Sequence, residues 1–415
     1  MSCVERVLIV GGGIGGLTLA AALNARGIDA EVIEREHEWQ ALGAGLSVQP
    51  NGLRVLAEYG LDEPVVAGGT TIERWVFADE AGRTLCEIDL DEVWGDVGPF
   101  VGTARARLQD ALVAGARHVP CRLGTSVSAL RQSNRRATVD FTDGSTADYD
   151  LVVGGDGIRS RVRELTFGNV EPTFAGQISW RSIAPVELPG RPSVQFWLGD
   201  RCFFGLCSVG EGRTYGFGYV SSARAVSSAR ARDPAEGRLE RLRSKFSDFG
   251  SIVQRYLGAL EDDEQIHCST IEWIEAERWH SGRVVLLGDA AHASSPMMGQ
   301  GGSLAMEDAH VLAELLSVET NLEDALSIYA SRRLPRVRWV QEQSRNVADS
   351  FNLDPAVRNE VLRTRGEAMF LLSRLRAAAA GDECYSWELE TVGGLVGGDG
   401  CAGACAQCVR GLFGE

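Results

Sequence analysis

The chain opens on a pattern of apolar runs and glycines that predicts a strand, a turn, a helix and a second strand. Residues 7–10 form an apolar run rich in β-branched side chains, which is typical of a buried parallel strand. A glycine run, 11–16, leads into the alanine-rich segment 17–25, for which we expect a helix. The next predicted strand covers 28–33 and is followed directly by an acid, Glu34.

The rest of the chain continues to alternate between helices and strands. Small residues predict a loop at 43–51, followed by a short helix, 52–59, that Asn51 caps. Alternating side chains predict two β-hairpins, and apolar runs predict further strands and helices. The hairpins are 71–77 with 83–88 and 137–141 with 147–153; the strands are 177–187, 193–198, 202–207, 214–219, 269–274 and 283–287; the helices are 105–112, 234–245, 252–260, 304–317 and 322–347.

Three of the predicted strands end in glycine-rich turns. These turns begin at Gly11, Gly154 and Gly288, and Asp156 and Asp289 stand in the second and the third. In an open α/β sheet, ligands bind beyond the carboxyl ends of the strands. We therefore expect the three turns to meet around one extended dinucleotide.

The first turn has the glycine spacing of a dinucleotide-binding site. Gly11 permits the tight turn, Gly13 lets the backbone approach a pyrophosphate, and Gly16 lets the helix pack against the strand. The positive N-terminal end of the helix would then face the phosphates, and Glu34 would accept hydrogen bonds from an adenosine ribose. The motif alone leaves FAD and NAD(P) open.

Composition narrows the class of protein. The chain has 415 residues, more than one ordinary domain, and a net charge of −16, which argues against partners such as nucleic acid or an anionic membrane surface. Glycines interrupt the apolar N-terminal run, so we expect neither a signal peptide nor a membrane span there. Most of the ten cysteines are scattered, which is typical of reduced thiols in a cytoplasmic enzyme.

Two smaller signals have more than one interpretation. His292 could be a general base, but its motif favours a packing or loop-fixing role. A cysteine cluster in the Gly-rich tail could bind zinc or an iron–sulfur cluster, although its weak spacing favours a disordered, redox-sensitive tail; its members are Cys384, Cys401, Cys405 and Cys408. The core shows no metal-ligand spacing, so we expect no metal there.

The chain resembles the group A flavoprotein monooxygenases of the para-hydroxybenzoate hydroxylase type. Three motifs carry the resemblance, in the same order and spacing over roughly residues 1–350: 11–16 with Glu34; 155–163 (GDGIRSRVR); and 288–292 (GDAAH) with Pro296 and 299–301. The resemblance implies an α/β fold, with a Rossmann-type FAD-binding domain, an inserted β-sheet substrate domain and C-terminal helices. The implied boundaries are 1–70, 101–174 and 266–375 for the FAD-binding domain, 71–100 and 175–265 for the substrate domain, and 376–415 for the Gly/Cys-rich tail.

The resemblance also implies which residues bind FAD. Glu34 would bind the adenosine ribose, Val127 would lie near the adenine, and Asp289 would bind the ribitol. Asp156 matches a residue linked to both FAD and NAD(P)H, and residues 299–303 would face the pyrimidine end of the flavin. The full implied set is Gly11, Gly13, Gly15, Gly16, Glu34, Arg35, Ser47, Arg105, Val127, Asp156, Asp289, Pro296, Gly299, Gln300, Gly301, Gly302 and Ser303.

The chemistry that the resemblance implies is hydroxylation of an aromatic or heteroaromatic small molecule. NADH or NADPH would reduce FAD, and O2 would add to the reduced flavin to give a C4a-hydroperoxide whose distal oxygen passes to the substrate. The sequence does not distinguish NADH from NADPH, and it does not give the oligomeric state.

From Ala175 onward the sequence pattern is similar to that of the salicylate, 3-hydroxybenzoate and urate hydroxylases. Arg201 and Tyr215 fall near the substrate-contacting arginine and tyrosine of the urate-acting members, although they could equally be a surface ion-pair residue and a sheet residue. Met297 stands where those members carry an acid. The resemblance thus implies Met297 as a substrate contact and a flatter, more apolar aromatic or bicyclic substrate than urate.

Other functions are possible on the same fold. A flavin-dependent epoxidase, halogenase or reductase is one alternative, and a non-catalytic flavin-binding protein is another. A halogenase would show paired tryptophans and an active-site lysine, whereas Trp180 stands alone and the only lysine, Lys245, lies far from every motif. A non-catalytic member would show degraded glycine or acid positions, and here all three motifs are intact.

Overall fold

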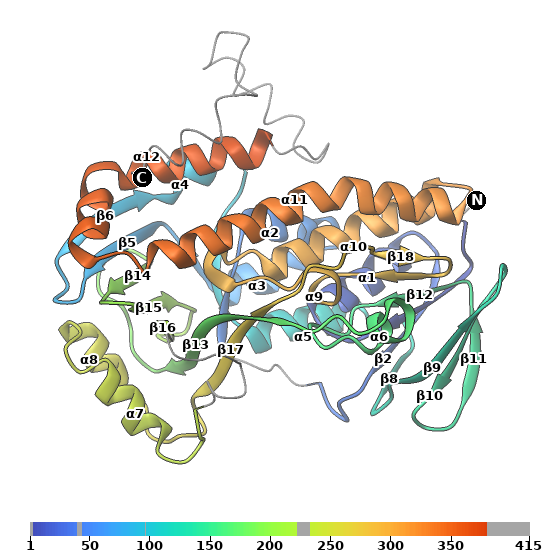
Figure 1. The fold of residues 1–415 in the computed structure, drawn as a ribbon, viewed down its shortest axis with the longest axis horizontal. Coiled ribbons are helices and arrows are strands. Elements are labelled where there is room, and N and C mark those ends of the chain that lie inside the picture. The colour runs from blue at the N-terminus through green and yellow to red at the C-terminus, as the bar shows by residue number, and fades with distance from the viewer. Residues whose placement is uncertain (1–2, 40–43, 96, 222–232, 380–415) are drawn as a thin grey trace, which may run out of the picture.

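The computed structural model describes residues 3–39, 44–95, 97–221 and 233–379, and it confirms the predicted α/β class (Figure 1). A central parallel sheet, a large mostly antiparallel sheet and two small sheets are joined by long helices. No helix in these ranges is long and apolar enough to cross a membrane. The cysteine cluster of the tail lies outside the described residues.

The first sheet has six strands in the order β18-β19-β12-β1-β2-β8. All its neighbours pair in parallel except β18 with β19. Buried apolar side chains fill the central strand, as expected for a strand covered on both faces. The strands are β1 (Arg6–Val10), β2 (Asp29–Glu34), β8 (Cys121–Leu123), β12 (Leu151–Gly154), β18 (His280–Ser281) and β19 (Val284–Leu286).

The helices of this half pack around that sheet. The predicted order of strand, glycine turn, helix and strand is confirmed, since α1 connects β1 to β2 and packs against α10. The helices are α1 (Ile14–Ala25), α2 (Pro50–Glu58), α3 (Asp62–Gly68), α5 (Arg105–Gly115), α6 (Arg161–Phe167), α9 (Asp289–His292), α10 (Gly301–Val318) and α11 (Leu322–Ser350, with Pro335 inside it). Figure 1 shows α11 running from this half toward the large sheet.

The segment predicted as one strand, 147–153, is in fact two. It splits at Asp150, whose carboxylate accepts hydrogen bonds from the backbone N–H groups of Glu5 and Arg6, both at 2.9 Å. The first part joins a three-stranded sheet and the second part is β12. That small sheet contains β9 (Val127–Gln132), β10 (Ala137–Phe141) and β11 (Thr146–Tyr149).

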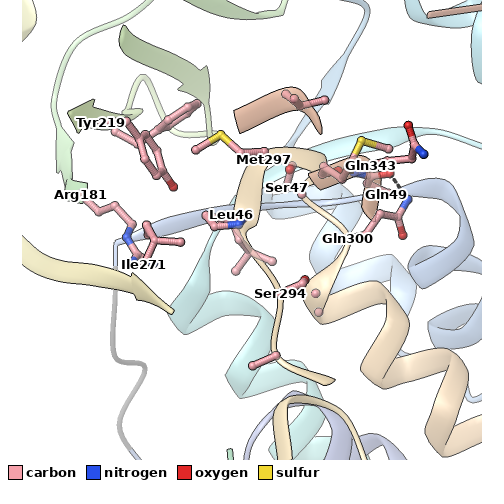
Figure 2. A pocket seen from close by; sticks show the side chains of 18 of the residues that line it. Leu46, Ser47, Gln49, Arg181, Tyr219, Ile271, Ser294, Met297, Gln300 and Gln343 are labelled. Atoms are coloured by element: carbon pink, nitrogen blue, oxygen red, sulfur yellow. Dashed lines mark hydrogen bonds between the residues drawn. The ribbon is translucent and has the colours of Figure 1, made fainter. Parts of the chain in front are cut away.

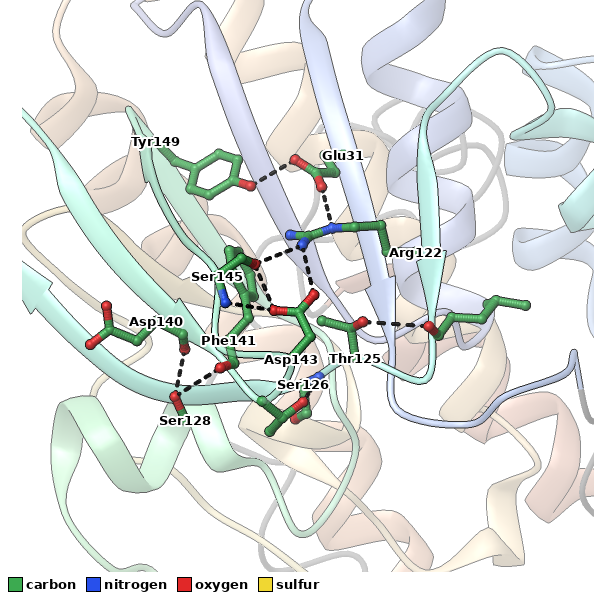
Figure 3. Close-up of polar contacts among 12 residues, drawn as sticks. Glu31, Arg122, Thr125, Ser126, Ser128, Asp140, Phe141, Asp143, Ser145 and Tyr149 are labelled. Carbon is green, nitrogen blue, oxygen red and sulfur yellow. Dashed lines mark hydrogen bonds and ion pairs between the residues drawn. The ribbon is translucent and has the colours of Figure 1, made fainter.

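A partly buried cluster of polar side chains ties the small sheet to the parallel sheet (Figure 3). Glu31 on β2 lies 2.6 Å from Arg122 on β8 and accepts a 2.7 Å hydrogen bond from the hydroxyl of Tyr149 on β11. Arg122 also reaches Asp143 in the turn between β10 and β11. Burial, and then the contact with Glu31, raise the pKa of Tyr149, so its hydroxyl stays a proton donor.

Two local predictions near residue 45 were wrong. The predicted loop contains the strand β3 (Gly45–Val48), which pairs with β7 (Phe100–Ala104), and β7 pairs in turn with β4 (Thr70–Ile72). The N-cap of α2 is Gln49 instead of Asn51. Gly45 fits there because the ring of Tyr215 lies against it, and a Cβ atom at this position would come within 2.6 Å of that ring.

The largest sheet has seven strands in the order β17-β13-β16-β15-β14-β5-β6. The predicted hairpin of β5 with β6 is confirmed, and it joins this sheet through parallel pairing of β5 with β14. The domain boundaries themselves stay a prediction. The strands are β5 (Arg74–Asp79), β6 (Thr84–Asp89), β13 (Thr173–Ala184), β14 (Ser193–Leu198), β15 (Cys202–Ser208), β16 (Thr214–Ser221) and β17 (His267–Trp273).

Helices cover both faces of this sheet, and each face has its own apolar cluster. On one face, α7 (Arg238–Lys245) and α8 (Ser251–Gly258) pack on Phe204 and Leu206. On the other face, α4 (Leu90–Trp94) and α12 (Pro355–Ala379) join a cluster rich in aromatic rings. Figure 1 shows α12 and α7–α8 on opposite sides of the sheet.

Candidate functional site

A cavity of about 1090 Å³ lies between the carboxyl edge of the parallel sheet and the aromatic face of the seven-stranded sheet. The three glycine turns predicted to converge all contribute to its lining, through Gly13, Gly155 and Gly288. The opposite wall comes from β5 and β13–β17, and the ends of α11 and α12 close a third side. The cavity therefore joins the predicted dinucleotide site to the predicted substrate region.

The glycine turn after β1 has the shape that a pyrophosphate needs. A Cβ atom on Gly11, whose φ is +107°, would lie 2.4 Å from the carbonyl oxygen of Gly155, and one on Gly16 would lie 1.9 Å from that of Gly11. Gly13, in contrast, has nothing within 4 Å of its Cβ position. No side chain caps α1 at Gly13, so the first N–H groups of the helix remain available to an anion.

Glu34, the predicted ribose ligand, organises the neighbouring loop. Its carboxylate accepts a 2.8 Å hydrogen bond from the N–H of Gly12 and a 3.0 Å bond from that of Glu36. Its neighbour Arg35 is exposed and pairs with Glu36 at 3.2 Å. Val127, predicted near the adenine, is buried in β9 and is absent from the cavity lining.

The carboxylate of Asp156, a predicted FAD and NAD(P)H residue, bonds to its own loop. Its carboxylate accepts hydrogen bonds from the hydroxyl of Ser160 at 2.5 Å and from the N–H groups of Arg161 at 2.7 Å and Val162 at 3.1 Å. Burial raises the pKa of Asp156, and these hydrogen bonds oppose the rise. The side chain thus holds the first turn of α6, and Asp156 does not line the cavity, although its neighbours Gly155 and Gly157 do.

Asp289 and Arg105 lie close enough in the cavity wall for their charges to interact. Asp289 begins α9 with its side chain exposed, Arg105 begins α5, and both line the cavity. Burial lowers the pKa of Arg105, and the charge of Asp289 opposes that change. Both residues were predicted to bind the cofactor, and that role stays a prediction.

The start of α10 forms the floor of the cavity. Pro296–Met298 make one 3₁₀ turn, Gly299 follows with φ of +64°, and α10 begins at Gly301 without a side-chain cap. Gly301 has nothing within 4 Å of its Cβ position. Ser303, also predicted to bind the cofactor, is buried under this turn and packs against Gly52.

A buried amide network fixes the floor, and sequence reasoning found only part of it. Gln49 donates a 2.6 Å hydrogen bond to the carbonyl oxygen of Met298 and accepts one from Gln300, as the dashed line in Figure 2 shows. Asn51 donates to Gln300 at 2.9 Å and to Glu307 at 2.6 Å. The network holds the turn before α10, and Gly301 and Gly302 at the start of this helix line the cavity.

His292 has the packing role that its motif favours. Its Nε2 lies 2.6 Å from an Oδ of Asp308, and its ring stacks on Trp279 with centroids 5.0 Å apart. Asp308 also accepts a 2.7 Å hydrogen bond from Arg333. Burial alone would raise the pKa of Asp308, but the charges of His292 and Arg333 lower it. His292 is absent from the cavity lining.

The cavity wall opposite the glycine turns is the aromatic face of the seven-stranded sheet. The register places Tyr215, Phe217 and Tyr219 on one face of β16, opposite Cys207, Gly205 and Phe203 of β15. Tyr215, Tyr219 and the predicted substrate contact Met297 all line the cavity. Burial raises the pKa of the Tyr215 hydroxyl far above its usual range, and the charge of Arg181 opposes the rise.

Arg201, the arginine predicted to contact the substrate, lies elsewhere. It is exposed in the turn between β14 and β15, with φ of +53°, and it does not line the cavity. Arg181 on β13 lines the cavity instead and donates a hydrogen bond to the hydroxyl of Ser269. Its buried Nε–H has no hydrogen-bond partner within the described residues. In Figure 2 the end of the Arg181 side chain is drawn beside Ile271.

Sequence reasoning missed Arg181 because two strands had to be registered before its orientation was known. Arg181 stands opposite Phe217 on β16 and His267 on β17, so it shares the face of Tyr215 and Tyr219. Alternation along β16 gives the face of the tyrosines, but only the register assigns Arg181 to it. Among the described residues there is no cluster of His, Cys, Asp and Glu that could hold a metal ion.

Comparisons with known proteins agree with this geometry. Residues 5–344 match the family model described as "FAD binding domain". The chain is 35% identical over 335 residues to the aurachin C monooxygenase/isomerase of Stigmatella aurantiaca, covering 80% of this chain and 85% of that protein. It is 33% identical over 363 residues to the 3-amino-4-hydroxybenzoate 2-monooxygenase of Streptomyces cremeus, and this match covers 84% of this chain and 88% of that protein.

A solved structure shows the same fold with its ligands in place. The structure is that of Klebsiella pneumoniae HpxO complexed with FAD and uric acid. The TM-score is 0.82 at 27% sequence identity, and the match covers 91% of this chain and 97% of that one.

Proposed function

The chain belongs to the FAD binding domain family and is an FAD-dependent monooxygenase, and from this we propose that it uses NADH or NADPH and O2 to hydroxylate an aromatic small molecule. The route we propose is the flavin C4a-hydroperoxide implied by the sequence resemblance. One observation carries the proposal: the uncapped starts of α1 and α10 open into the same cavity as the aromatic wall of the seven-stranded sheet.

The glycine cradle and the acids fit FAD. Gly13 leaves open space for the pyrophosphate beside the start of α1, and Asp289 and Arg105 flank the ring end. We propose that Glu34 exchanges its contact with the N–H of Gly12 for the ribose hydroxyls when FAD binds. When bound, FAD takes a hydride from NAD(P)H and activates O2, so that one oxygen atom goes to the substrate and the other to water.

The residues around the ring end would then perform two tasks. The uncapped N–H groups at Gly301 and Gly302 stabilise negative charge on the reduced flavin ring, since a helix N-terminus carries partial positive charge. The aromatic wall and Met297 exclude water from the place where oxygen is transferred.

Arg181 and Tyr215 would orient the substrate ring. The guanidinium of Arg181, which lines the cavity, would donate to a phenolate or carboxylate oxygen and so stabilise the electron-rich, deprotonated form of a phenol. Tyr215 stays protonated because burial raises its pKa, so its hydroxyl can donate to the same oxygen. This assignment replaces Arg201 with Arg181 as the substrate arginine.

The experiment is oxidation of NADPH and of NADH by the FAD-loaded protein in the presence of phenols, hydroxyquinolines and purines, with peroxide assayed alongside. The proposal expects one class of compound to accelerate oxidation without matching release of peroxide. If the protein binds FAD but neither reductant bleaches it with any ligand present, the monooxygenase proposal is wrong and a binding role replaces it.

A further inference from the structure

We propose that the substrate carries a long apolar tail, an alkyl or isoprenoid chain, and that this tail lies in an aromatic channel leading from the flavin end of the cavity to α12. This inference rests on the proposed function, since it describes the substrate of the same cavity. The ring to be hydroxylated would lie at Tyr215 and Arg181, and the tail would extend away from the flavin along the sheet.

The channel is a continuous path of aromatic rings. The ring of Tyr215 contacts that of Phe217 with centroids 5.1 Å apart, and Phe217 contacts Phe196 at 5.9 Å. Phe196 stacks on Phe77 at 4.9 Å. These rings belong to β16, β14 and β5, so the path crosses the sheet from β16 to β5, a strand three positions along.

A glycine lets the aromatic path lie close against the sheet. Gly205 on β15 stands between Phe217 and Phe196, and it pairs with both of them across the sheet. A Cβ atom on Gly205 would come within 2.1 Å of the Phe217 ring, so that ring can lie flat over the strand only because the position is glycine. The sheet side of the channel beyond Tyr215 is therefore lined by aromatic rings.

Helices and a loop form the opposite wall. Trp94 on α4, Phe351 after α11, and Leu362 on α12 line the cavity, and the ring of Phe351 lies 4.6 Å from that of Phe203. The helix α12 is held close to the sheet at Gly366, where a Cβ atom would come within 2.6 Å of Cys86 on β6. The far end of the channel is therefore closed by packed elements.

The channel walls keep apolar surface accessible even though they lie inside the protein. Several large side chains that line the cavity are only partly buried: Trp75, Trp94, Phe196, Phe217, Phe351 and Leu362. Apolar surface left in contact with water costs free energy, and an apolar ligand would recover it. A single aromatic ring at Tyr215 would leave this part of the cavity unfilled.

Among the described residues that line the far end, Arg358 carries a charge, and its hydrogen bonds are already made within the chain. Arg358 is buried, and it donates hydrogen bonds to the backbone carbonyl oxygens of Gly199 at 2.8 Å and Leu198 at 3.2 Å. Its charge is therefore committed to the chain and gives no anchor for a polar group. The chemistry that fits the far end is a hydrocarbon chain.

The test is equilibrium binding of 4-n-alkylphenols, from methyl to nonyl, to the FAD-loaded protein, followed by calorimetry. The expected result is a dissociation constant that falls about three- to fourfold for each added methylene, until the chain reaches α12. A dissociation constant that does not change with chain length would overturn the proposal. The series needs no variant, so it stands even if a substituted protein fails to fold.

A filled channel gives the matched comparison. Leu362→Trp places a large ring at the far end, so the gain in affinity per methylene should stop at a shorter chain than in the parent protein. Val357→Trp is the control, since Val357 is on the same helix and is 56% exposed. Identical behaviour of the two variants would count against the channel.

The outcomes also separate this inference from the proposed function. Chain-length-dependent binding without reductant-dependent turnover would leave the channel in place and remove the monooxygenase proposal. Turnover of short phenols, with a dissociation constant that does not change with chain length, would support the monooxygenase proposal and remove the channel.

Discussion

The imidazole Nε2 of His292 lies 2.6 Å from a carboxylate oxygen of Asp308, in a place that the cavity does not reach. Asp308 also accepts a 3.1 Å hydrogen bond from the N–H of Gly288 and one from Arg333. The most conspicuous histidine of the sequence therefore holds the turn that presents Asp289, and it has no path to a substrate proton.

This arrangement predicts that His292→Phe changes stability and leaves the chemistry intact. Phenylalanine keeps the stacking on Trp279 but loses a hydrogen bond to a buried carboxylate, which should cost about 1.5–3 kcal/mol. Urea unfolding measures the loss. The pH profile of kcat should match that of the parent protein, and the disappearance of one limb of that profile would show that His292 acts as a general base.

The buried carboxyls of α10 predict a loss of stability in acid. Burial alone would raise the pKa values of Glu307 and Asp308, but Arg333 and other nearby groups lower both. A carboxyl whose pKa is lower in the folded state stabilises the fold above its unfolded value, and the contribution disappears as the pH falls through the folded value. The free energy of unfolding should thus decline below about pH 4, near the usual Asp and Glu values.

A substitution assigns this acid dependence. Glu307→Gln should flatten the decline, because one of the two titrating carboxyls is gone, while the exposed Glu360→Gln should leave its slope unchanged. The measurement is urea unfolding of each protein from neutral to acid pH. Equal slopes in all three proteins would place the acid-sensitive groups elsewhere.

Substitution by alanine should have different effects at two glycines of the turn after β1. Gly16→Ala would bring a Cβ atom to 1.9 Å from the backbone oxygen of Gly11, so it should cost about 3 kcal/mol or more in stability. Gly13→Ala meets nothing within 4 Å, so the FAD-free protein should unfold as the parent does, while FAD binds roughly tenfold or more weakly. Thermal unfolding without FAD and titration with FAD measure the two effects. Normal FAD affinity in Gly13→Ala would place the pyrophosphate elsewhere.

The two arginines predict a clear contrast in substrate binding. Arg181→Met should weaken binding of a phenolate or carboxylate substrate by about ten- to a hundredfold, the value of a hydrogen bond to a charged group. Arg201→Met should change it by less than about twofold, since Arg201 is exposed outside the cavity. Ligand titration of both variants provides the measurement. Equal losses would return Arg201 to the site.

Sequence patterns predicted the dinucleotide half well because its determinants are local. The turn at Gly11, the start of α1 and the acid at Glu34 lie within one strand-helix-strand unit, so their spacing in the sequence predicts where each lies in that unit. Asp156 shows the limit of this reasoning. Its motif is intact, yet its carboxylate caps the backbone of its own turn, and motif spacing does not reveal where a side chain's hydrogen bonds go.

The substrate half could be predicted only in outline, because its geometry depends on pairing between distant strands. Strand identities followed from alternation, but the choice between Arg181 and Arg201 required the register of β13 with β16. The strand β3 was missed because Gly45 and its neighbours have weak strand propensity, and pairing with β7 overrides it.

The most direct test of the central claim is the origin of the oxygen atom in the product. The FAD-loaded protein, NAD(P)H and a phenol that accelerates its oxidation are incubated under isotopically labelled O2, and the product is analysed by mass spectrometry. The account predicts one labelled oxygen atom per hydroxylated product, with the other atom in water. Product without the label, or labelled peroxide as the sole fate of the O2, would contradict it.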